Sequence, residues 1–281
     1  RVSCFFDLLA EVSETEMFYR DHPQGFHASN PVDAWKGYIS DWNAMDGIYR
    51  RFCVSFDECQ LNSEEVPDAL RDAAEKAAVR VENLYVNWYL PSANGRWIGC
   101  CESEWADAGH IQGIAQQREF YNRYPSRNSK DYKRTMVIVS DGMRYEVGVE
   151  LARRLEQETK GSVTLEACQG VFPSVTEFGM AAILPQSELS YSWDSGEVFA
   201  DGLPTKTTSD REVVLQKAVP GARAVTAQDL RAGNRAARKQ LVGDAPLVYV
   251  YQDKIDSTGE KPKLEHDVFT ACASTVDEIV A

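Results

Sequence analysis

Two short apolar runs constrain the fold of this chain more than any other feature of its sequence. Residues 135–140 (TMVIVS) form a short apolar run that is typical of a strand buried on both faces of a sheet. Residues 247–251 (LVYVY) are rich in β-branched and aromatic side chains, which is also typical of a strand. Apolar residues at helical spacing follow the first run over 144–160 and precede the second over 226–242. This alternation predicts an α/β fold with a mainly parallel sheet flanked by helices.

Smaller elements are expected between these two strands. Residues 162–168 (SVTLEAC) are a candidate for a further strand, and residues 176–184 are a candidate for a short helix that ends at a proline. The polar stretch after that proline is expected to hold a hairpin over 197–205. Thr226 has the position of a helix N-cap, with Asp229 three residues further on.

The first part of the chain follows a different pattern and is expected to be helical. Large apolar side chains recur every three or four residues over 33–52 and over 64–89, which places them on one face of each helix. The turn-forming sequence at 91–99 (PSANGRWIG) is expected to end the second of these helices. A third helix is expected over 104–124.

The polar segment 125–133 (PSRNSKDYK) is expected to be a loop or linker where the pattern changes. We therefore expect a helical region over 1–130 and an α/β domain over 131–281. The chain begins with Arg1 within an expected helix, and residues 270–281 also have a helical pattern. The chain is thus expected to be a piece of a longer protein.

Composition excludes several classes of protein. The net charge of −13 gives the chain no average attraction for a polyanion, so contact with nucleic acid would need a local basic patch or a metal. No apolar stretch approaches the roughly 18 residues of a membrane span, so no membrane association is expected. Seven cysteines without a CxxC pair indicate reduced thiols and a cytoplasmic location, and they argue against a cysteine-based zinc site.

Acidic residues follow both of the main strands, at the edge of the sheet where α/β proteins bind ligands. Asp141 and Gly142 come directly after the first strand, while Asp253 and Asp256 follow the second. Carboxylates from two strand ends can converge on one hard or borderline cation. An alternative role for Asp141 is to cap the helix over 144–160.

A third candidate is Thr176, in the segment VFPSVTEFG. Its hydroxyl is expected at or near the start of a helix, a position that suits a phosphate or a developing alkoxide. A threonine hydroxyl is a poor nucleophile unless a base or a metal activates it, and Asp141 and Asp256 are the candidates to hold that metal. The alternative is that Ser174 or Thr176 caps the helix, with Glu177 in its first turn.

Taken together in this order, the segments SDGMRYE, VFPSVTEFGMAAILP and VYVYQDKIDSTGE resemble the PglZ family of BREX bacteriophage-exclusion systems, in the alkaline phosphatase superfamily. The resemblance is strongest at 140–146 and 173–176 and covers about 135–281. It implies an alkaline-phosphatase-like domain of which this chain holds the N-terminal part. It also implies a metal-dependent phosphodiesterase or phosphatase in bacteriophage defence, with a phosphodiester or nucleic-acid substrate and other BREX proteins as partners.

The resemblance also implies roles for single residues. Asp141 matches the first metal-binding carboxylate, and Thr176, which lies 35 positions later, matches the position of the nucleophile. Asp256 and Glu260 match a metal-binding Asp-x-x-Gly-His motif in which Glu replaces His. The implied cofactors are divalent metal ions, with zinc expected and manganese or magnesium as alternatives.

One part of the superfamily pattern is missing. The chain has no Asp-His-Gly segment, and its only Asp-His pair, at Asp21 and His22, lies in the helical region. The remaining ligands are therefore expected beyond residue 281, with His266 as a candidate outer ligand. The alternative function is a catalytically weak or inactive scaffold that binds other defence proteins or DNA through the helical region, which is rich in tryptophan and tyrosine.

Overall fold

The structure is a computed structural model. It describes residues 2–61, 63, 66–126, 134–260 and 265–281. Most of the expected linker at 125–133 lies outside this described part. Among the described residues, no helix combines the length and the apolar character that a membrane crossing requires.

The chain divides into two compact units, each built from separate stretches of sequence. The unit that we call the helical unit comprises Arg1–Gly113, Met143–Ala167 and Ser257–Ala281. The unit that we call the sheet unit comprises Ile114–Gly142 and Cys168–Asp256. The predicted division of the chain near residue 130 stays a prediction.

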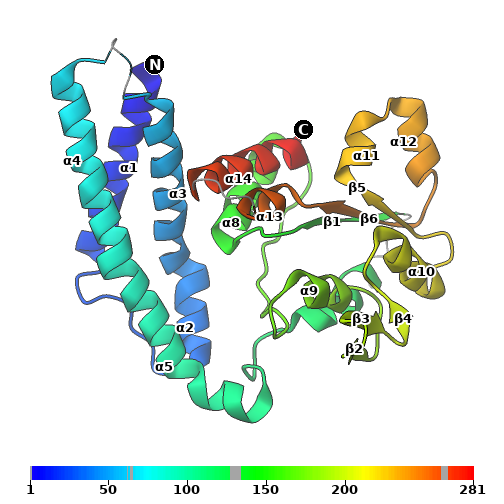
Figure 1. Cartoon of the computed structure of the whole chain (residues 1–281). Coiled ribbons are helices and arrows are strands. Elements are labelled where there is room, and N and C mark those ends of the chain that lie inside the picture. Colours follow the sequence, from blue (N-terminus) through cyan, green and yellow to red (C-terminus); the bar gives the residue numbers. More distant parts are fainter. Residues whose placement is uncertain (1, 62, 64–65, 127–133, 261–264) are drawn as a thin grey trace. The chain divides into compact units, whose positions relative to one another are not determined.

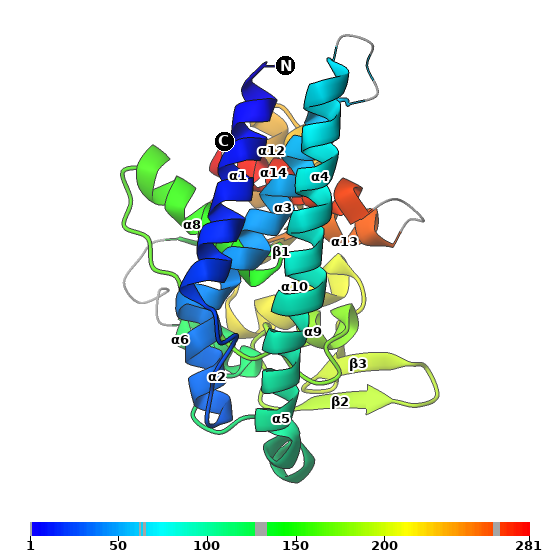
Figure 2. The same ribbon diagram turned by 90° about the vertical axis from the view of Figure 1, so that its left-hand side faces the viewer.

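In the helical unit, α1, α3 and α4 lie side by side, as Figures 1 and 2 both show. Helix α14 packs against both α3 and α8. Apolar side chains spaced three or four residues apart fill the spaces between these helices; Phe52, Val81 and Phe269 belong to one such cluster and are almost fully buried. The elements of this unit are α1 (Val2–Asp21), α2 (Pro31–Gly37), η1 (Tyr38–Trp42), α3 (Asn43–Glu58), α4 (Asp68–Leu84), η2 (Tyr85–Tyr89), α5 (Leu90–Ala108), α8 (Tyr145–Glu158) and α14 (Glu265–Val280).

The helix end predicted at 91–99 is wrong. Helices α4, η2 and α5 follow one another without a break, and the sequence PSANGRWIG lies inside α5. The π-helical turn η2 ends two residues before Pro91. A π turn is wider than an α turn, which leaves room for the proline ring at a position where proline has no backbone N–H to donate. The helix predicted over 104–124 is also wrong, because α5 ends at Ala108 and Gly109 follows it with a φ of 67°.

The sheet unit contains the predicted parallel sheet, and the expected fold class is confirmed. Strand β6 (Leu247–Gln252) lies between β1 (Thr135–Ser140) and β5 (Arg223–Thr226), and both pairs are parallel. All six residues of β6 are buried. The burial on both faces predicted for the strand over 135–140 is wrong, because Val137 is the only buried residue of β1 and Met136 and Ile138 are exposed. A second, antiparallel sheet contains β2 (Leu189–Ser192), β3 (Glu197–Ala200) and β4 (Leu203–Pro204), which confirms the hairpin expected over 197–205.

The helices of the sheet unit are short. Tyr249 in β6 donates a hydrogen bond of 2.9 Å to the carbonyl of Ile183, directly after α9, and so ties that helix to the central strand. Thr226 caps α11 as predicted, but the helix expected over 226–242 is interrupted at Gly233 and Asn234. These helices are α9 (Thr176–Ala182), α10 (Thr208–Ala218), α11 (Ala227–Ala232) and α12 (Arg235–Val242), with the short turns η3 (Gln117–Glu119) and α6 (Phe120–Arg123).

The strand predicted over 162–168 is wrong. That segment is mostly exposed and makes no ladder; the nearest pairing is an isolated bridge between Gln116 and Gln169. The third strand of the parallel sheet is instead β5, which has only four residues. The backbone N–H and C=O groups of a strand need a neighbouring strand to pair with. The local sequence does not show whether residues 162–168 or residues 223–226 will lie beside such a neighbour.

Candidate active site at the carboxyl edge of the sheet

The two predicted strand-end carboxylates lie at the same edge of the parallel sheet. In the register of β1 and β6, Ser140 is opposite Gln252, and the N–H of Asp141 continues this ladder with a hydrogen bond of 2.8 Å to the Gln252 carbonyl. Asp256 follows β6 within α13 (Lys254–Gly259). Because the strands are parallel neighbours, the residues after them leave the sheet on the same side.

Gly142 allows this edge to close tightly. Its φ is 72°, and a Cβ atom at this position would lie 3.2 Å from the backbone nitrogen of Asp256 and 3.4 Å from its Cα. The loop after β1 therefore passes directly against the backbone that carries Asp256, so that Asp141 and Asp256 are held near each other.

We expect Gly142→Ala to lower the free energy of unfolding by about 1–3 kcal/mol, because the new methyl group forces both an unfavourable φ and a contact with backbone that cannot rotate away. Denaturant unfolding followed by circular dichroism measures this loss. Gly202→Ala is the matched control, since Gly202 has a φ of 77° but nothing within 4 Å of the added Cβ. A loss no larger for Gly142→Ala than for Gly202→Ala would show that the close approach to Asp256 does not matter.

The environment of Asp141 disfavours its charge. Burial raises the pKa of its carboxyl, and the neighbouring charge of Asp256 raises that pKa further. The Thr176 hydroxyl, the N–H of Gly142 and the charge of Arg211 act in the opposite direction without cancelling the shift. Because the charge of Arg211 does not offset the effects of burial and of Asp256, the ionised form of this carboxyl would be favoured by a further positive charge, such as a cation.

Thr176 is the first residue of α9, and its hydroxyl is close enough to the Asp141 carboxylate to lower the pKa of that group. The N-cap of α9 is Val175, and no side chain makes a capping hydrogen bond there. The N-cap of α8 is Arg144, again without a side-chain cap. The capping roles considered for Ser174, Thr176 and Asp141 are thus not the roles that these side chains have.

Sequence reasoning missed Arg211, which lies in α10 of the same unit. Its guanidinium donates hydrogen bonds of 2.8 Å and 3.0 Å to the carbonyls of Thr205 and Lys206, and it lies 4.7 Å from the centre of the Tyr251 ring. These contacts fix a positive charge that acts on Asp141. The surrounding sequence offers no signal for this placement, because Arg211 belongs to an ordinary capped helix start after Thr207.

The chemistry of these residues fits part of a site for a divalent cation. Asp141 and Asp256 offer carboxylate oxygens, which suit zinc, manganese or magnesium. Among the residues that the structure describes, no three His, Cys, Asp or Glu side chains gather in a group that could hold a metal. Glu260 is exposed and belongs to the helical unit, and its role as a metal ligand stays a prediction. The side chain of His266 lies outside the described residues.

Comparison with known proteins agrees with these observations. A family model described as "BREX system PglZ alkaline phosphatase-like domain" matches residues 122–281, which include Asp141, Thr176 and Asp256. The chain is 33% identical over 251 residues to the alkaline phosphatase-like protein PglZ of Bacillus cereus (strain H3081.97), which covers 89% of this chain and 28% of that protein. It is 31% identical over 278 residues to the alkaline phosphatase-like protein BrxZ of Escherichia coli O9:H4 (strain HS), which covers 98% of this chain and 31% of that protein.

This chain thus spans less than a third of the length of these curated relatives. The family match covers more than half of the chain, and the similarity to the two relatives extends through the helical residues that precede it. The resemblance inferred from the three motif segments is confirmed: the chain belongs to the PglZ family of BREX alkaline phosphatase-like proteins.

Proposed function

We propose that this chain carries part of the active site of a metal-dependent phosphoryl-transfer enzyme, with a phosphodiester or nucleic-acid substrate, which acts with other BREX proteins in bacteriophage defence. This proposal rests mainly on the observation that three residues from distant segments of the chain lie near one another. Thr176 and Asp256 both act on the carboxyl of Asp141, which follows the end of β1 at the carboxyl edge of the sheet. A hydroxyl and a second carboxylate beside the partly buried carboxyl of Asp141 have no evident benefit to stability, and such arrangements are typical of functional sites.

In the proposed reaction, the Thr176 hydroxyl loses its proton to solvent and its Oγ1 forms a bond to phosphorus. The bond between phosphorus and the leaving oxygen breaks, and this oxygen takes up a proton. Water then attacks phosphorus and releases a proton to solvent, the bond between phosphorus and Oγ1 breaks, and Oγ1 takes up a proton, which regenerates Thr176. Asp141 orients the hydroxyl, and the fixed charge of Arg211 offsets the negative charge that the phosphoryl group brings to this edge.

Asp141 and Asp256 would hold the divalent ion, with Glu260 and ligands from the rest of the protein completing the set. Such an ion, expected to be zinc with manganese or magnesium as alternatives, would supply positive charge to the phosphoryl oxygens and favour the ionised form of a nearby hydroxyl. The cytoplasmic location expected from the reduced cysteines is part of the same proposal.

The scaffold alternative has an observation in its favour. Within the described part of the chain, no three His, Cys, Asp or Glu side chains form a group that could hold a metal, whereas a complete site has three or more protein ligands. A protein that kept the fold but lost the chemistry would serve to bind other defence proteins or DNA. The enzyme and the scaffold differ in what they require of Asp141, which provides a test.

We expect Asp141→Asn to abolish metal-dependent hydrolysis of bis(p-nitrophenyl) phosphate by the full-length protein while raising its melting temperature in EDTA at pH 7. A raised pKa means that the folded state holds the Asp141 proton more tightly than the unfolded state does. Stability from this group is therefore fully present below the usual aspartate pKa and falls as the pH rises through the shifted value. The amide removes this loss, so the gain in melting temperature should disappear at acidic pH.

Asp253→Asn is the matched control, because Asp253 follows the same strand but is exposed. It should change neither the rate nor the melting temperature appreciably. If Asp141→Asn retained the wild-type rate, or if the wild-type protein had no metal-dependent rate, the scaffold function would be favoured. If Asp141→Asn instead lowered the melting temperature at pH 7, Asp141 would have a structural role.

A further inference from the structure

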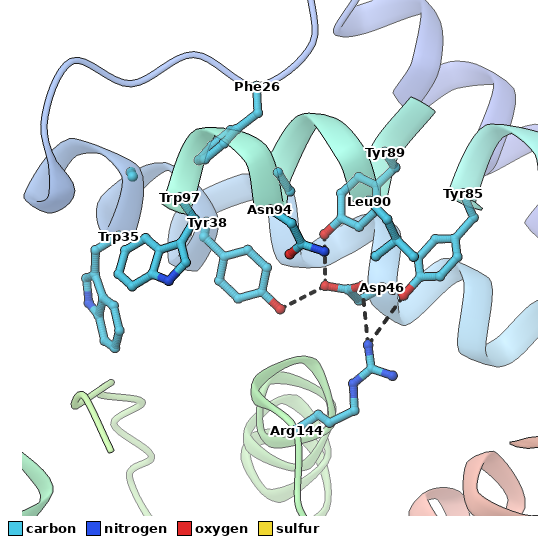
Figure 3. Close-up of a pocket in the computed structure, with 12 residues that line it drawn as sticks. Phe26, Trp35, Tyr38, Asp46, Tyr85, Tyr89, Leu90, Asn94, Trp97 and Arg144 are labelled. Carbon is cyan, nitrogen blue, oxygen red and sulfur yellow. Dashed lines mark hydrogen bonds and ion pairs between the residues drawn. The ribbon is translucent and has the colours of Figure 1, made fainter. Parts of the chain in front are cut away.

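The helical unit contains an aromatic pocket to which phosphoryl transfer assigns no role. Its cavity volume is about 390 Å³, within the roughly 300–1,000 Å³ of pockets that bind small ligands. Phe26, Trp35, Tyr38 and Trp97 form its walls (Figure 3). The two tryptophans are only partly buried, and their ring centres lie 6.1 Å apart at an interplanar angle of 42°, so they do not stack flat on each other.

The inner side of the pocket is built around the buried carboxylate of Asp46 (Figure 3). Its Oδ2 accepts hydrogen bonds of 2.8 Å from both Tyr38 and Tyr89, and its Oδ1 accepts one of 2.7 Å from Tyr85. Arg144 Nη2 lies 3.3 Å from Oδ1. Each carboxylate oxygen thus has two donors within hydrogen-bond distance. The hydroxyl of Tyr89 also lies 2.8 Å from the Trp42 carbonyl, so its one proton serves two acceptors.

These tyrosines come from unusual backbone. Tyr38 is the first residue of the π-helical segment η1, and Tyr85 and Tyr89 are the two ends of the π-helical segment η2. Such segments account for well under 1% of residues in proteins and occur frequently at functional sites. Two such segments supply the three tyrosines that donate to one buried carboxylate.

The hydrogen bonds around Asp46 decide which kind of ligand fits. A cationic ligand would find aromatic rings but no carboxylate oxygen free to accept from it. Arg144 pairs through Nη2 with Asp46 and through Nε with Glu146, at 3.0 Å, which leaves Nη1 available as far as the described part of the chain shows. The exposed amide of Asn94 also lines the pocket. A ligand that complements this pocket therefore has a flat aromatic ring with polar groups at its edge and an anionic group attached to the ring.

We propose that this pocket binds a nucleotide unit, with its base against Trp35 and Trp97, the base edge at Asn94, and its phosphate at Arg144. Base stacking on aromatic side chains and a charge-assisted bond to a guanidinium are strong and mutually compatible contacts. The nucleotide is either a free mononucleotide or an unstacked nucleotide of a single strand, because both present the same chemistry. This inference is independent of the role proposed for Thr176.

Calorimetric titration tests the proposal in the full-length protein carrying Thr176→Ala, with EDTA present, so that hydrolysis does not interfere and failure of the proposed enzymatic function leaves the assay intact. Adenosine monophosphate should bind at least about tenfold more tightly than adenosine or inorganic phosphate. Tetramethylammonium should not bind. A single-stranded oligoadenylate that binds as tightly as the mononucleotide would identify a strand as the source, and binding of the mononucleotide alone would identify a free nucleotide.

Variants at the pocket wall connect the binding to this site. Trp35→Leu and Trp97→Leu should each weaken binding of adenosine monophosphate at least about tenfold with an unchanged melting temperature. Trp193→Leu is the matched control, since Trp193 is 89% exposed and belongs to the sheet unit. The proposal is overturned if adenosine monophosphate does not bind, if its binding survives both pocket substitutions, or if tetramethylammonium binds in its place.

Discussion

Thr176→Ala is expected to reduce metal-dependent hydrolysis of an activated phosphodiester by the full-length protein at least about a hundredfold while leaving its melting temperature within about 2 °C of wild type. Water must then replace a positioned oxygen nucleophile, and this accounts for the loss of rate. Stability should change little, because Thr176 is exposed and does not cap α9. Initial rates and thermal unfolding, measured on the same preparations, check both expectations.

Two further variants make the Thr176 experiment decisive. Thr176→Ser keeps a hydroxyl at the same position and should retain a substantial part of the rate. Thr208→Ala removes a threonine from the corresponding first position of α10, in the same unit, and should leave the rate unchanged. A Thr176→Ala protein with a rate within a few-fold of wild type would exclude Thr176 as the nucleophile, whatever the effect on phage resistance.

Asp46→Leu is expected to have the largest effect on stability, a loss of about 3–5 kcal/mol in the free energy of unfolding of the helical unit. Burial is the main cause that raises the pKa values of the phenols of Tyr38, Tyr85 and Tyr89, and the charge of Asp46 raises them further. These phenols therefore stay protonated at neutral pH and donate to Asp46. Leucine would remove the acceptor that these three hydroxyls and Arg144 share, and the hydroxyl of Tyr89 would keep the Trp42 carbonyl as an acceptor.

Tryptophan fluorescence in a denaturant series measures this loss. Five of the six tryptophans belong to the helical unit, so the signal reports mainly on that unit. Asp46→Asn keeps one acceptor oxygen and should lose less, and Asp72→Leu, at an exposed position of α4 in the same unit, should stay within about 0.5 kcal/mol of wild type. Equal midpoints for Asp46→Leu and Asp72→Leu would mean that the Asp46 cluster does not stabilise the unit.

The sequence alone determined the parallel sheet and the edge at which the candidate site lies. Charge-free runs rich in β-branched or aromatic residues favour strands, and β1 and β6 formed as predicted, although β6 is buried throughout and β1 is not. Once these two strands are parallel neighbours, the residues that follow them must leave the sheet at one edge. The shared edge of Asp141 and Asp256 could therefore be predicted from the strand pattern of the two runs and from the rule that parallel strands end at the same edge of a sheet. The resemblance of the segment VFPSVTEFG to the family motif then identified Thr176 as the candidate nucleophile.

Only the tertiary structure decided the features that depend on distant partners. Helix α5 continues through Pro91 because a π-helical turn precedes it, and β5 is a strand because β6 lies beside it. Arg211 acts on Asp141 although 70 positions separate them in the chain.

The Asp46 cluster shows the physical reason most clearly. An aspartate in an amphipathic helix is ordinarily a surface residue, and nothing near Asp46 in the sequence signals its burial. It is buried because Tyr85 and Tyr89, 39 and 43 positions away, and Arg144, 98 positions away, supply donors that offset the cost of removing its charge from water. Local sequence sets the preference of each segment, but the cost of burying a charged or polar group is settled by whichever distant groups the fold brings to it.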